Sequence, residues 1–407
     1  GEGGARRGAG GGGGRAGRAM AAGGAGAGGA ALELRAGAEL GRGRYRVRRE
    51  LNRGGTAVVY EAEDRGEPGA GGGRGQRGAL KVMNSAGPGA RSQSLAAVKR
   101  EVGNAASLKH PNFVQLLDVF AEGPQRLVIV WELVTGPDLL DLLNACGGRM
   151  TEARAGKYLS QTAAAVEFLH ENNLCHRDLK PENCMVESQT DQIKIIDFGL
   201  SKHLDTAATL GVGTPDYMAP ELLNAGPGRA APGRYDARQV DVWALGVMLY
   251  LLVAGVYPFE DPKHPDNVAH TLQNVRLGRI APLPGVVSAS CADLIARMLH
   301  KNPRRRITLN GLKRHPWMMT HGDEALIPTE PEEPTDSKTK RSRASSKGCA
   351  TPRRSEELTR KASSLLKNSE SSRGAGEPAC SGGSAAPPAG SSKGIVKLFA
   401  RLKVDKS

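Results

Sequence analysis

The stretch from Leu174 to Gly199 constrains this chain of 407 residues more than any other part of its sequence. It reads LCHRDLKPENCMVESQTDQIKIIDFG, with Asp178 five residues before Asn183 and a second acid, Asp197, after the apolar run IKII. Carboxylate and amide oxygens are ligands that Mg²⁺ takes beside nucleotide phosphates, and a further carboxylate can accept a hydroxyl proton. The stretch therefore predicts a phosphoryl-transfer site, with Asn183 and Asp197 as metal ligands and Asp178 as the proton acceptor.

The order HRDLKPEN and then DFG resembles the signature set of the eukaryotic protein kinases. An isolated Asp in a solvated loop is a poor alternative, because both motifs occur together. The resemblance implies a bilobal α+β protein kinase fold, with a small antiparallel β-sheet lobe and a larger helical lobe, and it implies ATP and Mg²⁺ as cofactors. Lys180 stands where Ser/Thr kinases carry a Lys that contacts the γ-phosphate and the substrate hydroxyl, so a Ser/Thr protein kinase is implied.

The resemblance continues along the chain and assigns supporting roles to further residues. GTPDYMAPE contains Thr214, which the family uses to support Asp178. DVWALG contains Asp241, which the resemblance places behind the backbone of the HRD turn. PRRRIT contains Arg306, the implied ion-pair partner of Glu221. These residues are expected to orient the site and to perform no chemistry.

The nucleotide is expected to bind to an N-terminal sheet. YRVRREL and AVVYEAE alternate apolar and polar residues, which predicts a half-buried β-hairpin. The loop between them, LNRGGTAVV, lies where kinases have LGxGxxGxV, but only Gly54 is in register, which restricts the loop backbone. ALKV resembles the VAIK strand, and the resemblance pairs Lys81, which grips the α- and β-phosphates, with Glu101. The residues implied at the nucleotide are Leu51, Gly54, Val59, Ala79, Lys81, Glu132, Asn183 and Asp197.

The strand LVIVWELV is expected to lead into the hinge, where adenine bonds to the backbone. By register, Trp131 stands at the gatekeeper position and is large for it. Ala105 stands four residues after Glu101, where the family has a bulkier residue. We hypothesise that the two compensate in volume, and a register error of one residue is the alternative.

Composition divides the chain into regions. Its first part is Gly, Ala and Arg with little apolar bulk, and its last part is rich in Pro, Ser and Lys. A Gly-rich insert is expected at 64–78. The basic amphipathic segment near the C-terminus is too short for a helix that is stable alone in water. The expected regions are a disordered leader at 1–43, the sheet lobe at 44–134, the helical lobe at 135–320, and a disordered basic tail at 321–407 with a candidate helix at 393–404.

The formal charge of +14 lies mostly in the two tails. Residues 1–50 carry a net +6 and residues 321–407 a net +5, which leaves +3 for the rest, so nucleic acid is not an expected partner. No apolar run of about 18 residues occurs, so no integral membrane association is expected. We expect a monomer. The six cysteines form no CxxC pair, which predicts free thiols in a reducing compartment, cytoplasmic or nuclear.

Within the kinases, the chain is similar to the calcium/calmodulin-dependent and AMP-activated-like group. The strongest similarity is to the second subfamily of plant SNF1-related kinases, and it lies in REVGNAASLKHPNFV, IIDFGLSK and YPFEDPKHPDNVAHTLQNV. The tail lacks the acidic run of that subfamily, which puts the subfamily's regulatory partners in doubt. The resemblance implies stress or nutrient signalling and protein substrates with basic motifs. The basic amphipathic segment near the C-terminus predicts a tail-binding regulator as a further partner.

Specificity and regulation rest on a few side chains. Asp138 and Glu182 are acids expected to favour Arg upstream of the target residue. Thr206 and Thr209 lie between DFG and GTPD, and phosphate on either, Thr209 in preference, is expected to order that loop. Ser363 ends the sequence LTRKAS, with Arg at minus three, and we expect its phosphorylation in cis at a raised effective concentration. The alternative for Ser363 is a chance match to the motif. The alternative for Thr206 and Thr209 is a loop that is ordered without modification.

Two functions from different classes remain open. One is an active Ser/Thr kinase, and the other is a pseudokinase scaffold that binds ATP or partners without transfer. The altered glycine loop favours the scaffold. The active kinase is favoured by the presence together of Lys81, Glu101, Asp178, Asn183 and Asp197.

Overall fold

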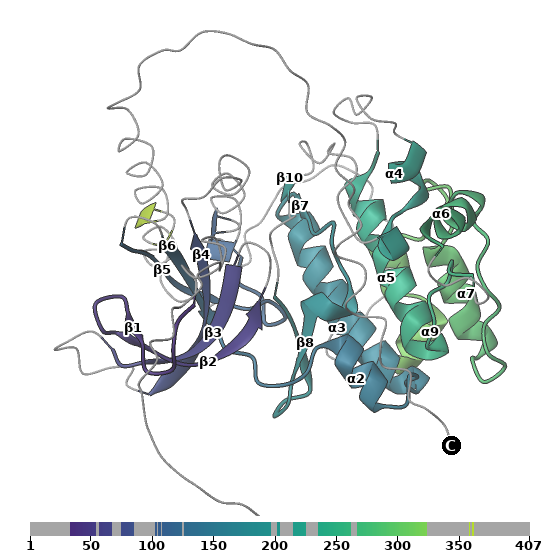
Figure 1. Ribbon diagram of the computed structural model, residues 1–407. Coiled ribbons are helices and arrows are strands. Elements are labelled where there is room, and N and C mark those ends of the chain that lie inside the picture. The colour runs from purple at the N-terminus through teal and green to yellow at the C-terminus, as the bar shows by residue number, and fades with distance from the viewer. Residues whose placement is uncertain are drawn as a thin grey trace, which may run out of the picture. The chain divides into compact units, whose positions relative to one another are not determined.

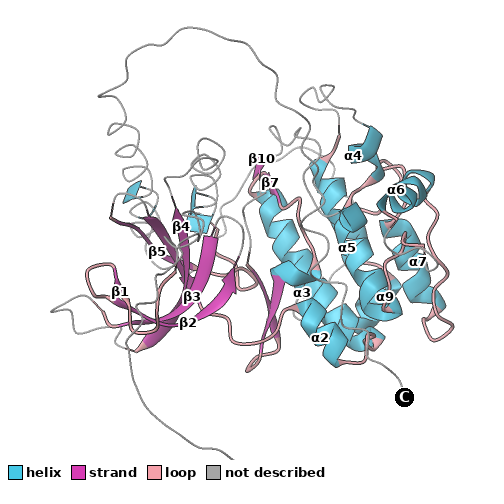
Figure 2. Ribbon diagram, in the orientation of Figure 1, coloured by secondary structure: helices cyan, strands magenta, loops and turns pink. Residues whose placement is uncertain are grey.

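A computed structural model describes residues 33–53, 57–66, 75–84, 102–103, 105–106, 108–123, 126–196, 202–203, 215–224, 235–261, 267–323, 358 and 360–361. Along these residues an antiparallel sheet is followed by a group of helices (Figure 1). Figure 2 shows the magenta strands of the sheet and the cyan helices in separate groups. The predicted α+β organisation, with a sheet lobe and a helical lobe, is confirmed.

Six strands form the sheet in the order β1-β2-β3-β4-β6-β5, and all neighbouring pairs are antiparallel. The predicted hairpin is β2 and β3, and its alternation buries Tyr45 and Val47 on one face. There they pack with Tyr60 and Leu80 into a hydrophobic cluster. The strands are β1 (Glu39–Leu40), β2 (Tyr45–Arg53), β3 (Ala57–Asp64), β4 (Gln76–Asn84), β5 (Leu116–Glu122) and β6 (Arg126–Glu132).

Two of the expected boundaries are wrong. The leader predicted at 1–43 ends earlier, because β1 pairs with β2 and Leu40 is buried. The insert predicted at 64–78 is shorter, because Asp64 at the end of β3 pairs with Gln76 at the start of β4. In the first place backbone pairing forms the short strand β1, and in the second it lengthens β3 and β4. Both involve residues whose composition is typical of a loop.

The helical region is built around α5, whose residues are nearly all buried and which packs against α3 and α7. By length and composition α5 could cross a membrane, but it lies inside the protein as a core helix. It ends at Gly255, where φ is 79° and any Cβ would collide with the carbonyl oxygen of Gly148. The helices are α2 (Leu139–Ala145), α3 (Glu152–Glu171), α4 (Pro220–Asn224), α5 (Ala237–Ala254), α6 (Val268–Leu277), α7 (Ala289–Met298), α8 (Leu309–Lys313) and α9 (Pro316–His321).

Short strands connect the sheet lobe with the helical lobe. The N–H of Ile195, on β9, donates to the carbonyl oxygen of Asn112 at 2.8 Å, and the N–H of Val114 donates to the carbonyl oxygen of Ile195 at 3.1 Å. These bonds fix β9 against the loop that precedes β5. The short elements are β7 (Leu174–Cys175), a 3₁₀ turn (Pro181–Asn183), β8 (Cys184–Glu187), β9 (Gln192–Ile195), β10 (Lys202–His203) and a second 3₁₀ turn (Pro215–Tyr217).

Candidate active site

The turn between β7 and β8 brings together three of the predicted site residues. Lys180 places Nζ 3.2 Å from Oδ2 of Asp178. Asn183 donates from Nδ2 to the carbonyl oxygen of Asp178 at 2.8 Å and to its Oδ2 at 3.3 Å. The 3₁₀ turn Pro181–Asn183 sets this spacing. Because the amide nitrogen of Asn183 is held by Asp178, the amide oxygen is oriented to serve as a metal ligand.

Asp241 holds the backbone of this turn in place through hydrogen bonds. Its Oδ2 accepts the N–H of His176 at 3.0 Å and Nε2 of His170 lies 2.8 Å away, while its Oδ1 accepts the N–H of Arg177 at 2.9 Å. The side chain is fully buried, and burial opposes its charge, but the hydrogen bonds outweigh burial and hold the pKa of Asp241 below its usual value. The sequence-based expectation for this residue is confirmed. Arg177 itself adopts φ of 71°, which the two bonds help to maintain.

The hairpin of β8 and β9 ends beside Asn183, one residue before the second predicted metal ligand. Cys184 pairs with Ile195, and the N–H of Ile196 donates to the carbonyl oxygen of Asn183 at 3.0 Å. The chain therefore passes Asn183 one residue before Asp197. Asp197 itself lies outside the described residues.

Lys81, predicted to bind phosphates, lies on β4 in the middle of the sheet. On β4 it is directly opposite Val59 of β3 on one side and Ile129 of β6 on the other. Directly opposed residues of antiparallel strands point to the same face. Ala79, two residues earlier on the same strand, also points there. The strands therefore present a Lys between apolar side chains, as nucleotide binding requires, and Leu51 lies at an irregularity of β2 with its side chain exposed.

Glu132 has a structural role that the sequence did not reveal. Its Oε1 lies 2.7 Å from Nζ of Lys194, and its Oε2 accepts the N–H of Gln115 at 3.0 Å. The side chain thus ties the end of β6 to β9, and any contact with a nucleotide falls to its backbone. The only signal for this contact in the sequence is Lys194, a charged residue inside the apolar run IKII.

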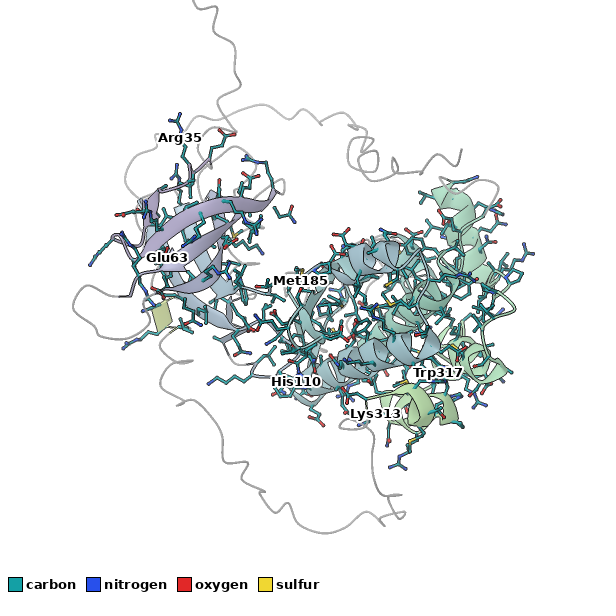
Figure 3. The ribbon with its side chains drawn as sticks, turned by 90° about the horizontal axis from the view of Figure 1, so that it is seen from below. Arg35, Glu63, His110, Met185, Lys313 and Trp317 are labelled. Carbon is teal, nitrogen blue, oxygen red and sulfur yellow. The ribbon has the colours of Figure 1, made fainter. Side chains whose placement is uncertain are left out.

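A cluster of acidic side chains, Asp138, Asp178 and Glu182, lies at and beside the turn between β7 and β8. Burial raises the pKa of Glu182, and the charges of Asp138 and Asp178 add to the rise although Lys180 opposes it. Within the described part of the chain, Oε2 of Glu182 is buried and accepts no hydrogen bond. Asp138 also caps α2, since its Oδ1 accepts the N–H of Asp141 at 2.8 Å, and burial raises its pKa. Figure 3 shows the side chains of the described residues as sticks, with Met185 of β8 labelled.

Several predictions fall outside what the structure describes, and others are only partly tested. Trp131 and Ala105 are buried in one hydrophobic cluster, as volume compensation requires, and the compensation stays a hypothesis. Arg306 and Glu221 form the expected ion pair, with Nη1 and Oε1 2.7 Å apart. Outside the described residues lie Gly54, Glu101, Asp197, Thr206, Thr209, Thr214, Ser363 and the candidate helix at 393–404.

The residues present fit Mg-ATP. Lys81 lies among apolar side chains on the strands, and Asn183 offers an amide oxygen beside Asp178. Among the described residues no group of three or more His, Cys, Asp or Glu side chains forms a metal site. A nucleotide-borne Mg²⁺ needs only one or two protein oxygen ligands, because phosphates and waters supply the rest.

Comparison with known proteins identifies relatives. A family model described as protein kinase domain matches residues 45–318. Serine/threonine-protein kinase SAPK9 of Oryza sativa subsp. japonica is 38% identical over 247 residues, which cover 58% of this chain and 66% of that protein. Serine/threonine-protein kinase SRK2G of Arabidopsis thaliana is 38% identical over 235 residues, which cover 56% of this chain and 64% of that protein. The chain spans just under two thirds of the length of these relatives.

Proposed function

Because the chain belongs to the protein kinase domain family, we propose that it is a Ser/Thr protein kinase, which transfers the γ-phosphoryl group of Mg-ATP to protein hydroxyls. The observation that carries this proposal is the set of contacts around Asp178. Among the described residues, Lys180 and Asn183 both contact its Oδ2. Its Oδ1 is therefore the oxygen left to accept the proton of a substrate hydroxyl.

Each residue of the site has one task in this reaction. Asp178 holds the attacking hydroxyl and takes its proton, and Lys180 stabilises negative charge beside it. Lys81 binds the α- and β-phosphates. Asn183 and Asp197 would hold Mg²⁺, which neutralises the charge of the phosphates when it is bound. Asp241 keeps the backbone of the turn in place and contacts no reactant.

The acidic side chains of Asp138 and Glu182 support a preference for substrates with upstream Arg. Glu182 is a half-buried carboxyl group whose Oε2 has no hydrogen-bond donor within the described part of the chain, and Asp138 lies close enough to raise its pKa. A guanidinium group would supply donors and positive charge to both acids. This preference, with a place in the calcium/calmodulin-dependent and AMP-activated-like group, stress or nutrient signalling and a cytoplasmic or nuclear location, belongs to the proposal.

A phosphorylation assay tests the proposal. Purified protein, Mg-ATP labelled at the γ-phosphate and a generic Arg-containing peptide should give labelled peptide, and the matched Asp178→Asn variant should give almost none.

The degraded glycine loop, LNRGGTA, favours the second candidate, a pseudokinase scaffold. Binding of Mg-ATP by the wild-type protein without any transfer to a panel of peptides would exclude the active kinase.

A further inference from the structure

Two buried side-chain amides hold the backbone of β9 in place. The N–H of Ile193, on β9, donates to Oε1 of Gln161 on α3 at 2.7 Å. Its carbonyl oxygen accepts a hydrogen bond from Nδ2 of Asn112 at 2.9 Å, and the same Nδ2 donates to Oε1 of Gln161 at 3.4 Å. Among the described strands only β8 pairs with β9, so the two amides serve buried backbone groups that no strand bonds. We call Asn112 and Gln161 the amide clasp.

The amide clasp is connected to a proposed metal ligand through one short strand. The carbonyl oxygen of Asn112 accepts the N–H of Ile195 at 2.8 Å, so the clasp holds β9 at two of its residues. The next residue, Ile196, donates its N–H to the carbonyl oxygen of Asn183 at 3.0 Å. A displacement of β9 relative to α3 would therefore be passed to Asn183, whose amide oxygen is the proposed ligand of Mg²⁺.

The chain that leaves α9 returns to the same part of α3. A Cβ on Gly156 of α3 would collide with the carbonyl oxygen of His321, the last residue of α9, so the two helices are in close contact there. Two residues later the N–H of Asp323 donates to Oγ of Ser160 at 2.9 Å. The Oδ2 atom of Asp323 accepts a hydrogen bond from Nε2 of Gln161 at 3.3 Å. Both ends of the Gln161 amide are therefore engaged, one by β9 and the other by the exit from α9.

The two contacts of Gln161 select one orientation of its amide. The N–H of Ile193 needs an acceptor, and the carboxylate of Asp323 needs a donor. A rotation of the amide by half a turn would place its nitrogen against an N–H and its oxygen against a carboxylate, so both contacts would become repulsive. Asp323 therefore keeps Oε1 of Gln161 directed at β9.

We propose that Gln161 is a positioning residue for Asn183, and that Asp323 keeps Gln161 in its working orientation. The inference rests on the proposed kinase function, because that function gives Asn183 its role as a ligand of Mg²⁺. Gln161 and Asp323 act through β9 and have no task at the nucleotide or the substrate.

An exchange of donor and acceptor tests the contact. Gln161→Glu sets two carboxylates against each other, so we expect β9 to be held less firmly. Asp323→Asn alone keeps an oxygen that can accept from Nε2 of Gln161 and should resemble the wild-type chain. Gln161→Glu combined with Asp323→Asn pairs a donor with an acceptor again and should restore wild-type behaviour. Gln161→Met removes the acceptor for Ile193, so Asp323→Asn should not rescue it.

Two measurements report how firmly β9 is held. Hydrogen exchange followed by mass spectrometry needs no catalysis, and the β9 peptide should exchange faster in Gln161→Glu and in Gln161→Met. The Mg²⁺ concentration that half-saturates ATP binding, measured by titration calorimetry, should rise about two- to tenfold in these variants, the range for one lost intramolecular hydrogen bond.

A second contact between α3 and the same hairpin provides the matched control. Nζ of Lys157 lies 2.8 Å from Oδ2 of Asp191, at the turn of the hairpin and away from Asn183. Lys157→Gln breaks this partly exposed ion pair and should leave the Mg²⁺ requirement unchanged.

The outcomes separate positioning from stability. A wild-type Mg²⁺ requirement in both Gln161→Glu and Gln161→Met, even with lower stability to urea, would overturn the positioning role. A double variant no better than Gln161→Glu would overturn the role of Asp323. A wild-type chain that binds Mg-ATP without any transfer would refute the kinase proposal instead, and the exchange and Mg²⁺ measurements would still decide the role of Gln161.

Discussion

Asp178 depends on other residues for its position. Asn183 holds both its carbonyl oxygen and its carboxylate, and Lys180 contacts the same carboxylate oxygen. Asp241 holds the two N–H groups that precede it in the chain. These residues restrict the carboxylate to one orientation before any substrate binds, which is the condition for efficient proton transfer from a positioned hydroxyl.

The base and the metal ligand should be separable by mutation. Asp178→Asn removes the proton acceptor, so we expect transfer to fall by about 10²- to 10⁴-fold with nucleotide affinity nearly unchanged. Asp197→Asn removes a metal ligand and should weaken Mg²⁺-dependent ATP binding as well. Isothermal titration with Mg-ATP and steady-state kinetics measure the two effects. Equal losses of ATP affinity in both variants would show that the assignment of the roles is wrong.

The raised pKa of Glu182 predicts a pH-dependent specificity. A carboxyl group with a raised pKa becomes protonated at a higher pH than an ordinary Glu, whose pKa is about 4.3. The preference for a peptide with Arg at minus three over its Ala analogue should therefore shrink as the pH falls below neutral, at a higher pH than an ordinary Glu would cause. Glu182→Gln should lower the preference at neutral pH and remove its pH dependence. A wild-type preference that is constant over this range would contradict the role of Glu182.

At the scale of elements, the sequence predicted the secondary-structure elements that have a strong local sequence pattern. The β2–β3 hairpin follows from its alternation of apolar and polar residues. The turn around Asp178 follows from a motif whose spacing is fixed. β1 and the longer ends of β3 and β4 were missed because backbone pairing, and not side-chain pattern, forms them. The burial of Leu358, in a tail that was expected to be disordered, was missed because one buried Leu leaves no periodic signal.

The pairing of β7 with β10 makes the loop between the DFG and GTPD motifs a candidate switch. Lys202 pairs with Cys175, two residues before Arg177, so the chain that leads to Thr206 and Thr209 starts beside the HRD turn. Phosphate on Thr209 would attract Arg177, whose Nη2 now lies 3.5 Å from the hydroxyl of Tyr235.

Phosphatase treatment tests this switch. Dephosphorylated protein should lose on the order of tenfold in kcat, within the usual range of coupling between two sites. Thr209→Ala should show the low value before and after treatment, and Thr206→Ala is the matched control. Equal activity of treated and untreated wild-type protein would argue against regulation at these residues.

At the scale of the whole molecule, ion pairs join segments that are distant in sequence. The side chain of Arg306 is fully buried. It contacts Glu221 of α4 through Nη1 at 2.7 Å and Nη2 at 2.9 Å. Its Nη1 also donates to the carbonyl oxygen of Gln239 on α5. Its guanidinium carbon lies 5.0 Å from the ring centroid of Trp243. One side chain thus connects α4, α5 and the loop before α8.

Loss of one partner of this ion pair should cost more than loss of both. Arg306→Met leaves the Glu221 carboxylate without its partner, and we expect the free energy of unfolding to fall by about 3–5 kcal/mol. The double variant Arg306→Met with Glu221→Gln should recover part of that loss. Urea unfolding followed by circular dichroism measures both. A double variant no more stable than the single one would show that the stability comes from the contacts with Gln239 and Trp243.

The bond between Ile196 and Asn183 also determines where the chain can tolerate extra residues. Between these two positions, β8 and β9 pair in a fixed register, and the turn at 188–191, exposed at 188–190, lies outside that pairing. An epitope tag or a fluorescent reporter inserted between Gln189 and Thr190 would lengthen the turn and leave the pairing of β8 with β9 unchanged. The same insertion within either strand would disrupt that pairing, so this turn is the place for a label in live-cell work.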